Sequence, residues 1–472
     1  MAMSPLLPLH LLLIPLLSSL PTCPSSSPHH HHHHIVTTLP GYDAAGDHPN
    51  PIPFRLETGY VTVDDNHNSE LFYYFFESEN DPTRDPILLW LTGGYRCSVL
   101  SAVFFEVGPV RLALHPYRPY DLAAGDLPRL KYHPYGWTKA ASVLFVDSPV
   151  GAGFSFSGDP DGYLVGDVSA SLQLKRFLSK WISDHPDYLS NPFYIGGDSY
   201  AGKIVPFLVH KISEDIDAGV WPIVNLKGYL VGNPGTGESI DLDSRVPYAH
   251  GAGIISDQLY ETIMEHCGGE DYYSNPKNAI CEQAMKRFNE LLNEGSSGNI
   301  LKNYCIYDSD IHHGTIPPFP PRECIEQTYG NYLIYFWANN NITREALGIK
   351  KGSVGEWLRC HNGDLPYSMD IKSNIKYHRS VTTKGYRALV YSGDHDALVP
   401  FLGTQTWVRS LNFSIVDDWR AWHVDGQSAG FTITYMNNMT FATVKGGGHT
   451  APEFEPEKCL AMFQRWISNE PL

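Results

Sequence analysis

The sequence predicts an α/β fold in which helices cover both faces of a mostly parallel central sheet. Short, continuously apolar segments alternate along the chain with segments whose apolar residues recur at helical spacing. Continuous apolar strands separated by helices indicate a parallel sheet that is buried on both faces. Between residues 235 and 383 the alternation stops, and the chain becomes rich in charge, proline and glycine and contains five of the eight cysteines. We therefore expect this region to be an inserted helical cap that disulfides staple together.

The expected elements divide the 472 residues into five parts. Strands are expected at residues 71–77, 87–91, 142–146 and 226–231 and in apolar runs that begin at 193, 387 and 441, and helices at 168–182, 203–212 and 456–467. The parts are a signal peptide at 1–28, a histidine-rich tract at 29–34, a core at 35–234, the cap at 235–383 and the rest of the core at 384–472.

Ser199 is the strongest candidate for a catalytic residue, because it lies in a sharp turn between an expected strand and an expected helix. Residues Gly197–Ala201 read Gly-Asp-Ser-Tyr-Ala. Small residues on both sides let the backbone bend until the hydroxyl is exposed above the sheet, which is the physical basis of the nucleophile elbow. Alanine stands where that motif has its last glycine. A structural turn serine is the alternative interpretation, so the partners of Ser199 decide between the two.

Suitable partners follow two later strands. Asp394 and Asp396 come after the run that begins at 387, and His449 comes after the run that begins at 441. The order serine, acid, histidine is typical of α/β-hydrolases. Open α/β sheets gather their chemistry at the carboxyl ends of the strands. We therefore expect Ser199, His449 and one of the two aspartates to meet there, with no metal or organic cofactor needed for the chemistry.

The charge and the N-terminal segment limit the partners and the compartment. A formal net charge of -17 argues against binding to nucleic acid or to an anionic membrane. Residues 5–17 are leucine-rich and a Pro/Ser-rich stretch follows, as in a cleaved secretory signal. We expect the secretory pathway, ending in the vacuole or outside the cell, and no membrane contact after signal removal. The histidines at 29–34 are an added tag or a natural tract that could bind metal loosely, and they are left out of the expected fold.

The cysteines and sequons fit the same compartment. Apart from Cys23, in or beside the signal, seven cysteines remain, which predicts three bridges and one free thiol. Glycosylation sequons begin at Asn341, Asn412 and Asn438. Residues 294–298 read Glu-Gly-Ser-Ser-Gly, a flexible and protease-accessible loop by composition. Cleavage there would give a two-chain form held together by disulfides.

Five motifs, in register from about Leu39 to the C-terminus, resemble those of the plant serine carboxypeptidase-like proteins. They are Trp-Leu-Thr-Gly-Gly from Trp90, Phe-Val-Asp-Ser-Pro-Val-Gly-Ala-Gly-Phe-Ser-Phe from Phe145, Gly-Asp-Ser-Tyr-Ala-Gly from Gly197, Ser-Gly-Asp-His-Asp from Ser392 and Gly-Gly-Gly-His from Gly446. The resemblance implies an α/β-hydrolase core with a helical insertion. It also implies Ser199 as nucleophile, Asp396 as the acid and His449 as the base.

The resemblance implies roles for further residues. The backbone N–H groups of Gly94 and Tyr200 would form the oxyanion hole, whose donors typically contribute ~3–4 kcal/mol to transition-state stabilisation. The substrate-binding positions would be Thr92, Gly93, Glu106 and Asp147. The cysteines would pair as Cys97 with Cys360, Cys267 with Cys281 and Cys305 with Cys324, which leaves Cys459 free.

One departure from the family pattern follows Gly94. The family has Gly-Gly-Pro-Gly-Cys-Ser here, whereas Tyr95 and Arg96 replace the Pro-Gly pair in this chain. A stiff proline and a permissive glycine are therefore lost from a tight turn beside the oxyanion hole. Two interpretations stay open: a reshaped pocket wall in which one of the two side chains faces the substrate, or a surface pair on a tolerant turn.

Thr92 and Asp147 favour an acyltransferase over a peptidase. Family peptidases have Asn and Glu at these positions, and with a further glutamate, here Glu106, they share a proton and hold the product carboxylate. Threonine lacks the amide through which asparagine donates two protons, and aspartate is one methylene shorter than glutamate. Both changes therefore weaken the hold on the product carboxylate. Thr and Asp are also what the family's glucose-ester acyltransferases carry.

We therefore predict transfer of an acyl group from a 1-O-glucose ester to an alcohol or amine acceptor in plant secondary metabolism. The alternative is a serine-type carboxypeptidase that releases C-terminal amino acids at acid pH, and a third is a non-catalytic binding module. The expected partners are a small acyl donor and acceptor, or a peptide C-terminus. The sequence leaves the oligomeric state open.

Overall fold

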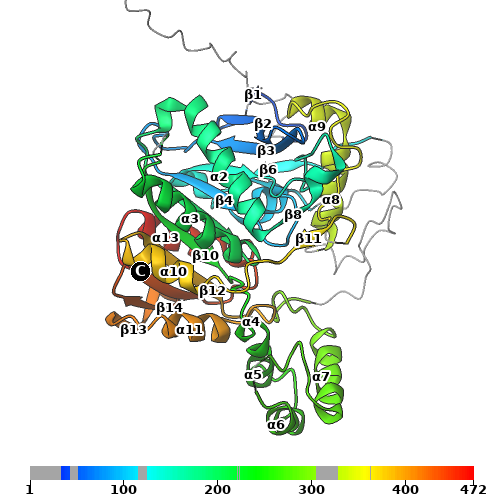
Figure 1. Ribbon diagram of the computed structural model, residues 1–472, viewed down its shortest axis with the longest axis vertical. Helices are drawn as coiled ribbons and strands as arrows, with labels where there is room; N and C mark the ends of the chain where they lie inside the picture. Colours follow the sequence, from blue (N-terminus) through cyan, green and yellow to red (C-terminus); the bar gives the residue numbers. More distant parts are fainter. Residues whose placement is uncertain are drawn as a thin grey trace, which may run out of the picture. The chain divides into compact units, whose positions relative to one another are not determined.

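An 11-stranded sheet forms the centre of the computed structural model, in the order β1-β2-β3-β7-β4-β9-β10-β12-β15-β14-β13 (Figure 1). The structure describes residues 33–42, 52–114, 125–220, 222, 224–269, 271–303, 328–361 and 363–472. The central strands from β7 to β15 run parallel to one another, and antiparallel strands flank them on both sides. The expected parallel arrangement therefore holds for the centre of a mixed sheet.

The strands of this sheet vary in length and exposure. They are β1 (His33–Val36), β2 (Leu56–Asp64), β3 (Ser69–Phe76), β4 (Ile87–Leu91), β7 (Ser142–Val146), β9 (Phe193–Asp198), β10 (Leu226–Gly232), β12 (Arg387–Gly393), β13 (Ile415–Val424), β14 (Gln427–Tyr435) and β15 (Met439–Val444). Two small ribbons pair β5 (Val110–Leu112) with β6 (Leu130–Tyr132), and β8 (Val165–Gly166) with β11 (Tyr367–Ser368).

The helices and short helical turns lie between these strands. The α-helices are α2 (Asp167–Asp184), α3 (Ala201–Asp217), α4 (Ile240–Asp243), α5 (Arg245–Gly251), α6 (Asp257–His266), α7 (Ala279–Leu292), α8 (Thr328–Asn339), α9 (Asn341–Ala346), α10 (Ile375–Thr383), α11 (Phe401–Ser410), α12 (Ala451–Phe454) and α13 (Pro456–Ile467). The turns are the π-helix η1 (Ala102–Glu106) and the 3₁₀ helices η2 (Trp137–Lys139), η3 (Pro160–Tyr163) and η4 (Pro186–Tyr188).

Strand β4 shows why the central strands read as unbroken apolar runs. Leu88 and Trp90 pack into one hydrophobic core, while Ile87, Leu89 and Leu91 pack into the core on the other face. Successive side chains of a strand point to opposite faces, so a strand buried on both faces needs apolar residues throughout. The segments expected at 87–91 and 142–146 coincide with β4 and β7 for this reason.

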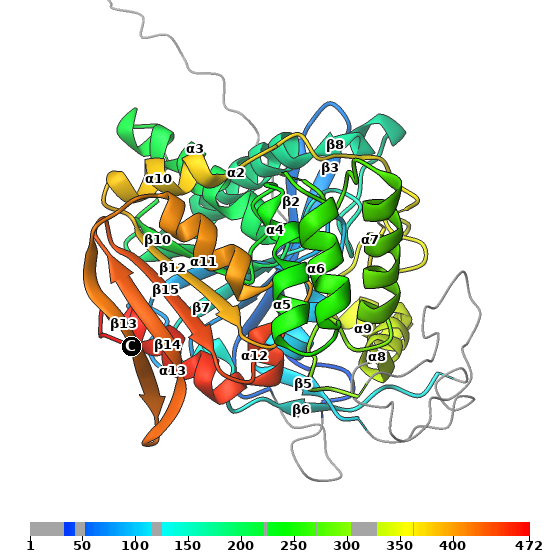
Figure 2. The same ribbon diagram turned by 90° about the horizontal axis from the view of Figure 1, so that it is seen from below.

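Two layers of helices enclose the sheet (Figures 1 and 2). Buried side chains of α2, α3, α10 and α11 belong to one core, and those of η1, α8 and α13 belong to the other. Helix α2 is a typical case, because Leu174, Phe177, Leu178 and Trp181 recur at helical spacing and are all buried. The helix starts with Gly166 N donating to Ser169 Oγ at 2.8 Å.

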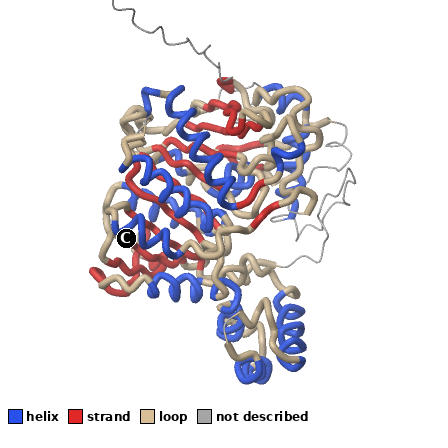
Figure 3. The backbone as a smooth tube through the Cα atoms, viewed as in Figure 1, coloured by secondary structure: helices blue, strands red, loops and turns tan. Residues whose placement is uncertain are grey.

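The region between residues 235 and 383 divides between two environments. Helices α5, α6 and α7 share a small hydrophobic core of their own and project from the rest of the fold in Figure 3. The Cys267–Cys281 disulfide joins the end of α6 to α7. Helix α10, in contrast, returns to the sheet and packs against α3, where Phe207 and Tyr377 meet edge to face. The expected cap is therefore helical and stapled, but its last helix covers the sheet.

Some expected features lie outside the described residues. These are the signal segment at 1–28, including Cys23, the first four histidines of the tract, and the pair Cys305 and Cys324. The last two histidines of the tract are ordered in the sheet, because β1 pairs His33 with Gly59 and His34 with Thr58. None of the helices in the described part of the chain is long and apolar enough to cross a membrane.

Candidate active site

Ser199 lies in a strained turn between β9 and α3. Its φ of 52° is in the left-handed region, which non-glycine residues enter at a cost. The Ser199 N–H donates to Gly232 O at 2.9 Å, which holds the turn against β10. A Cβ at Gly93 would lie 2.4 Å from Ser199 Cβ, so only glycine lets the loop after β4 pass this close. This geometry is that of the nucleophile elbow expected from Gly197–Ala201.

His449 and Asp396 reach Ser199 from two other strands. His449 Nε2 lies 2.7 Å from Ser199 Oγ, and His449 Nδ1 lies 2.8 Å from Asp396 Oδ2. The order β9-β10-β12-β15 is parallel throughout, so the loops after β9, β12 and β15 meet at one edge of the sheet. A hydroxyl, an imidazole and a carboxylate are therefore in hydrogen-bond contact, which is the geometry that activates a serine.

The two candidate aspartates have different partners. Asp396 is fully buried, and its Oδ1 accepts from Leu398 N at 2.7 Å while Oδ2 also accepts from Asn233 Nδ2 at 2.8 Å. Asp394 Oδ1 instead accepts from Gly446 N at 2.7 Å and lies 2.5 Å from His395 Nδ1. Only Asp396 contacts the histidine that faces Ser199, as the resemblance implies.

Asn233 is a site residue that the sequence reasoning missed. It follows β10 directly, its Nδ2 donates to Asp396, and its Oδ1 accepts from Gly393 N at 3.0 Å. Both ends of the amide are thus used to hold the loop that carries Asp396. Its position just past the carboxyl end of a central strand was the available signal, since the other site residues occupy equivalent positions.

The charge state of His449 is set by opposing effects. Burial lowers the pKa of His449, but the charge of Asp396 and its hydrogen bond raise it, and the charge of Asp198 raises it further. The net result is a raised pKa. Asp396 therefore favours the protonated form of His449, as expected of the acid in a catalytic triad.

The expected oxyanion donors lie on either side of Ser199. Gly94 has a φ of 76° and follows Gly93, and Tyr200 is the N-cap residue of α3. Within the described residues, neither backbone N–H donates to another group. Backbone N–H groups at a helix N-terminus and in an adjacent glycine turn can donate hydrogen bonds to an oxygen that develops negative charge.

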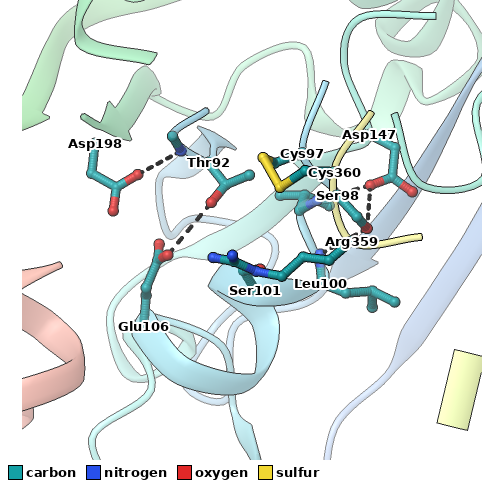
Figure 4. The surroundings of a disulfide bond; sticks show 12 residues. Thr92, Cys97, Ser98, Leu100, Ser101, Glu106, Asp147, Asp198, Arg359 and Cys360 are labelled. Atoms are coloured by element: carbon teal, nitrogen blue, oxygen red, sulfur yellow. Dashed lines mark hydrogen bonds between the residues drawn. A yellow bond between two sulfur atoms is a disulfide. The ribbon is translucent and has the colours of Figure 1, made fainter. Parts of the chain in front are cut away.

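Thr92, Glu106 and Asp198 gather beside the Gly93 backbone (Figure 4). Gly93 N donates to Asp198 Oδ1 at 2.9 Å, and Thr92 Oγ1 lies 3.5 Å from Glu106 Oε1. Burial raises the pKa of Asp198 to about 6, and burial together with the charge of Asp198 raises the pKa of Glu106 well above its ordinary value. The repulsion between the two buried carboxyls favours the protonated form of Glu106, and a protonated carboxyl can donate a hydrogen bond. Asp198 is a second residue that the sequence reasoning did not single out.

Asp147 lies apart from this group, on the far side of the Cys97–Cys360 disulfide in Figure 4. Its Oδ1 accepts from Ser98 Oγ and Val99 N, both at 2.8 Å, and its Oδ2 accepts from Phe154 N at 2.9 Å. Burial raises the pKa of Asp147 to about 6 despite these bonds. The structure therefore brings Thr92, Gly93 and Glu106 together but does not join Asp147 to them.

Arg96 fits neither of the two interpretations that the sequence left open for the Tyr95–Arg96 pair. Arg96 is fully buried and donates to the carbonyl oxygens of Val150, Tyr163 and Pro366, the last at 2.7 Å. Its φ of 61° marks a left-handed position that glycine occupies more easily, at a cost of about 1–2 kcal/mol for other residues. Arg96 therefore ties three loops together rather than facing a substrate or the solvent.

Tyr95 belongs to a group of three tyrosines beside the elbow. Its ring stacks on Tyr367 with centroids 5.0 Å apart and meets Tyr200 edge to face at 5.7 Å. The hydroxyls of Tyr200 and Tyr367 both donate to the buried Asp167 Oδ1, at 2.6 and 3.0 Å. Tyr95 is thereby held against the residue that supplies one expected oxyanion donor.

The loop predicted to be protease-accessible continues into contacts with the active site. Glu294 and Gly295 are exposed, in line with the prediction from composition. However, Gly298 O accepts from His449 N at 2.6 Å, and Asn299 Nδ2 donates to Gly446 O at 3.3 Å. The far end of the loop is thus bound to the strand end that carries the histidine.

The covalent features are consistent with the secretory pathway. The structure contains the Cys97–Cys360 and Cys267–Cys281 disulfides, and Cys459 is buried as a free thiol. The three sequon residues, Asn341, Asn412 and Asn438, are all exposed.

Comparisons with known proteins agree with the predicted family and fold. The serine carboxypeptidase family matches residues 46–469. Serine carboxypeptidase-like 9 of Arabidopsis thaliana is 46% identical over 437 residues, covering 93% of this chain and 94% of the relative. Serine carboxypeptidase-like 19 of the same plant is 42% identical over 455 residues, covering 93% and 94%. A solved prohormone-processing carboxypeptidase from Saccharomyces cerevisiae has a TM-score of 0.70 at 18% identity, covering 92% of this chain and 95% of that one.

The fold and the family together define an α/β-hydrolase enzyme of the serine hydrolase or acyltransferase type. The chain belongs to the serine carboxypeptidase family, and its curated relatives are serine carboxypeptidase-like proteins.

Proposed function

We propose that the protein transfers an acyl group from a 1-O-glucose ester to an alcohol or amine acceptor through an acyl-enzyme on Ser199. The position of Asp147 carries this proposal. Within the described residues, the hydrogen bonds of its carboxylate go to Ser98 and Val99 in the loop after β4 and to Phe154 in the loop after β7, so the carboxylate is already occupied. A peptidase needs donors aimed at the product carboxylate, and Thr92 contributes a single hydroxyl where an amide would offer two protons. The grip on a peptide C-terminus is therefore weak.

The proposed chemistry uses the contacts around Ser199. Ser199 Oγ attacks the ester carbonyl carbon as its proton moves to His449 Nε2, and the resulting oxyanion is held by the N–H groups of Gly94 and Tyr200. The tetrahedral intermediate collapses as His449 gives the proton to the leaving 1-oxygen of glucose, which leaves the acyl group on Ser199. An acceptor hydroxyl or amine then gives its proton to His449 and attacks the acyl carbon. Ser199 regains its proton as the ester or amide product leaves.

A specific observation supports a second candidate, a serine-type carboxypeptidase. The raised pKa of Glu106 favours the protonated carboxyl beside Thr92, and this form can donate to a product carboxylate. This single donor would serve a peptidase at acid pH. We favour the transferase because the Asp147 carboxylate is already occupied and Thr92 offers only one hydroxyl proton. Together they hold a product carboxylate less well than the residues of a peptidase would.

Product analysis separates the two candidates. The purified protein is given a glucose ester with a panel of alcohols and amines, and separately N-blocked dipeptides, at mildly acid pH. Transfer products that form faster than free acid, and disappear in Ser199→Ala, are the expected result. Rapid release of C-terminal amino acids without any transfer product would overturn the transferase in favour of the peptidase.

A labelling experiment tests the third possibility, a non-catalytic binding module. A fluorophosphonate probe is expected to label Ser199, because the serine has an imidazole at hydrogen-bond distance. Folded protein that stays unlabelled would support a binding module.

We propose the vacuole or the extracellular space as the final location, which microscopy of a tagged protein in plant cells can test.

A further inference from the structure

Three potential metal ligands converge at the edge of the sheet that carries β1. They are His33 on β1, Glu57 on β2 and His185 at the C-cap of α2. Their ligand atoms all lie within 4.8 Å of one another. His185 precedes the start of β9, whereas Ser199 follows its end, so this cluster lies away from the active site.

Glu57 Oε1 is the centre of the cluster. It lies 2.8 Å from His185 Nε2 and 3.2 Å from His33 Nδ1, and the carboxylate is buried. Ligands about 2.05 Å from a tetrahedral Zn²⁺ are about 3.3 Å apart. The two spacings that Glu57 makes are thus close to what a bound ion requires, and all three ligand atoms lie within 4.8 Å of one another.

His185 is oriented as a metal-binding histidine is. Its Nδ1 lies 2.7 Å from Trp181 O, a carbonyl that can only accept, so the Nδ1 proton is committed to that bond. The Nε2 lone pair of the neutral ring then faces a carboxylate oxygen that is also an acceptor, and at 2.8 Å a proton joins the two atoms, which a metal ion can replace when they move slightly apart. A carbonyl that fixes the second ring nitrogen is the usual outer partner of a histidine ligand. Stacking on Trp181, with centroids 4.2 Å apart and planes at 18°, holds the ring in this orientation.

His33 leaves one side of the cluster open. Its side chain is partly exposed, and its Nδ1 lies 2.7 Å from Tyr73 OH, which itself donates to Glu57 Oε1 at 2.7 Å. Tyr73 therefore orients the carboxylate from the inner side. Because Tyr73 gives its only proton to Glu57, His33 Nδ1 carries the proton of its bond to Tyr73, and an ion bound at Nδ1 would displace that proton. Water can reach the outer side and supply a fourth ligand.

We propose that His33, Glu57 and His185 bind a divalent transition-metal ion, with Zn²⁺ the best match, and that this ion fastens the N-terminal strand to the fold. Two imidazole nitrogens and one carboxylate oxygen suit Zn²⁺ and its neighbours rather than Mg²⁺ or Ca²⁺, which prefer oxygen ligands. Strand β1 is a short edge strand, and among the described strands it pairs only with β2. The ion would join it to β2 and to the end of α2, and would stabilise the native state by mass action.

The test must exclude loose binding by the neighbouring histidines. The parent protein therefore has His29, His30, His31 and His32 replaced by serine, because a histidine run binds Zn²⁺ without a structured site. His33→Ala is compared with His34→Ala, its neighbour on the same strand, whose Nε2 bonds Ala346 O instead. Zn²⁺ binding is measured by competition with a chromophoric chelator, and the site geometry by the visible absorption of bound Co²⁺.

We expect the parent and His34→Ala to bind one Zn²⁺ per chain and to show a higher thermal midpoint with Zn²⁺. The Zn²⁺ affinity of His33→Ala should be lower by roughly tenfold or more, since loss of a residue that only hydrogen-bonds to a ligand already lowers metal affinity 10–100-fold. The thermal midpoint of His33→Ala should not respond to Zn²⁺. Glu57→Gln, which keeps the shape of the side chain, should also lose the ion. Fluorophosphonate labelling of Ser199 checks that each variant is folded. Absence of stoichiometric binding in the parent, or equal binding by His33→Ala and His34→Ala, would overturn the proposal.

Discussion

The backbone N–H of His449 donates to the carbonyl oxygen of Gly298 at 2.6 Å. Gly298 of the cap region, more than a hundred residues away in the sequence, thus holds the backbone of His449, the proposed general base. Ala397 N, next to Asp396, donates in the same way to Ser297 O at 2.9 Å. Both loops that carry the proposed acid and base therefore rest on the segment that follows the exposed part of the Glu294–Gly298 loop.

This contact predicts that Gly448→Ala lowers kcat. A Cβ at Gly448 would lie 2.4 Å from Gly298 O and 2.6 Å from Asn299 Cβ, so the segment must move. A displacement of about 1 Å at a reacting group costs roughly 100-fold in rate. We expect a loss of kcat of about 10–100-fold on a p-nitrophenyl ester.

Gly295→Ala is the matched control, because a Cβ there meets nothing within 4 Å. It should leave kcat unchanged. If Gly448→Ala folds and retains full kcat, the contact between Gly298 and His449 does not position the base.

Asp198→Asn is expected to shift the acid limb of the pH profile of kcat/KM to lower pH. The neutral form of His449 is the active base, and the charge of Asp198 raises its pKa. A raised pKa means that activity appears only at higher pH, so removal of that charge moves the limb down. Asn can still accept from Gly93 N through its amide oxygen, which preserves the loop. Initial rates between pH 4 and 8 give the limb, and an unchanged or higher midpoint would contradict the assignment.

Thr92→Asn is expected to raise hydrolysis of N-blocked dipeptides. The amide adds donors beside Glu106, and a hydrogen bond to a charged group contributes about 1.5–3 kcal/mol, or roughly 10–100-fold in kcat/KM. The double variant with Asp147→Glu should gain more only if the longer side chain leaves its bonds to Ser98 and Val99.

Thr92→Ser is the control for this change, since it keeps a single hydroxyl and should leave peptide hydrolysis low. No gain in either Asn variant would show that these positions do not decide between transfer and hydrolysis.

Arg96→Gly is expected to lower the free energy of unfolding by about 2 kcal/mol. Glycine relieves a left-handed backbone that costs about 1–2 kcal/mol. It also leaves the carbonyls of Val150, Tyr163 and Pro366 without their donor in a buried site, at about 1–3 kcal/mol for each one that water cannot reach. The second effect is larger. Chemical denaturation measures the change, with the exposed Arg84→Ala as a control expected within about 0.5 kcal/mol of the parent.

For strands β4, β7 and β13, predictability followed how completely each strand is buried. Strands β4 and β7 are buried on both faces, so their apolar runs marked their ends to the residue. Strand β13 is mostly exposed and has no such pattern, so it was not predicted. Strand β1 begins inside a histidine tract whose composition suggests no strand at all.

The sequence by itself determined the α/β class, the elbow at Ser199 and the chain order of serine, acid and histidine. Local composition and strand ends carry that information, because burial and turn geometry constrain nearby residues directly. Tertiary structure alone decided that Asp147 turns to Ser98, that Arg96 joins three carbonyls and that Gly298 supports His449. These contacts join residues far apart in sequence, and which donor a buried carboxylate or carbonyl meets depends on distances that only the packed chain sets.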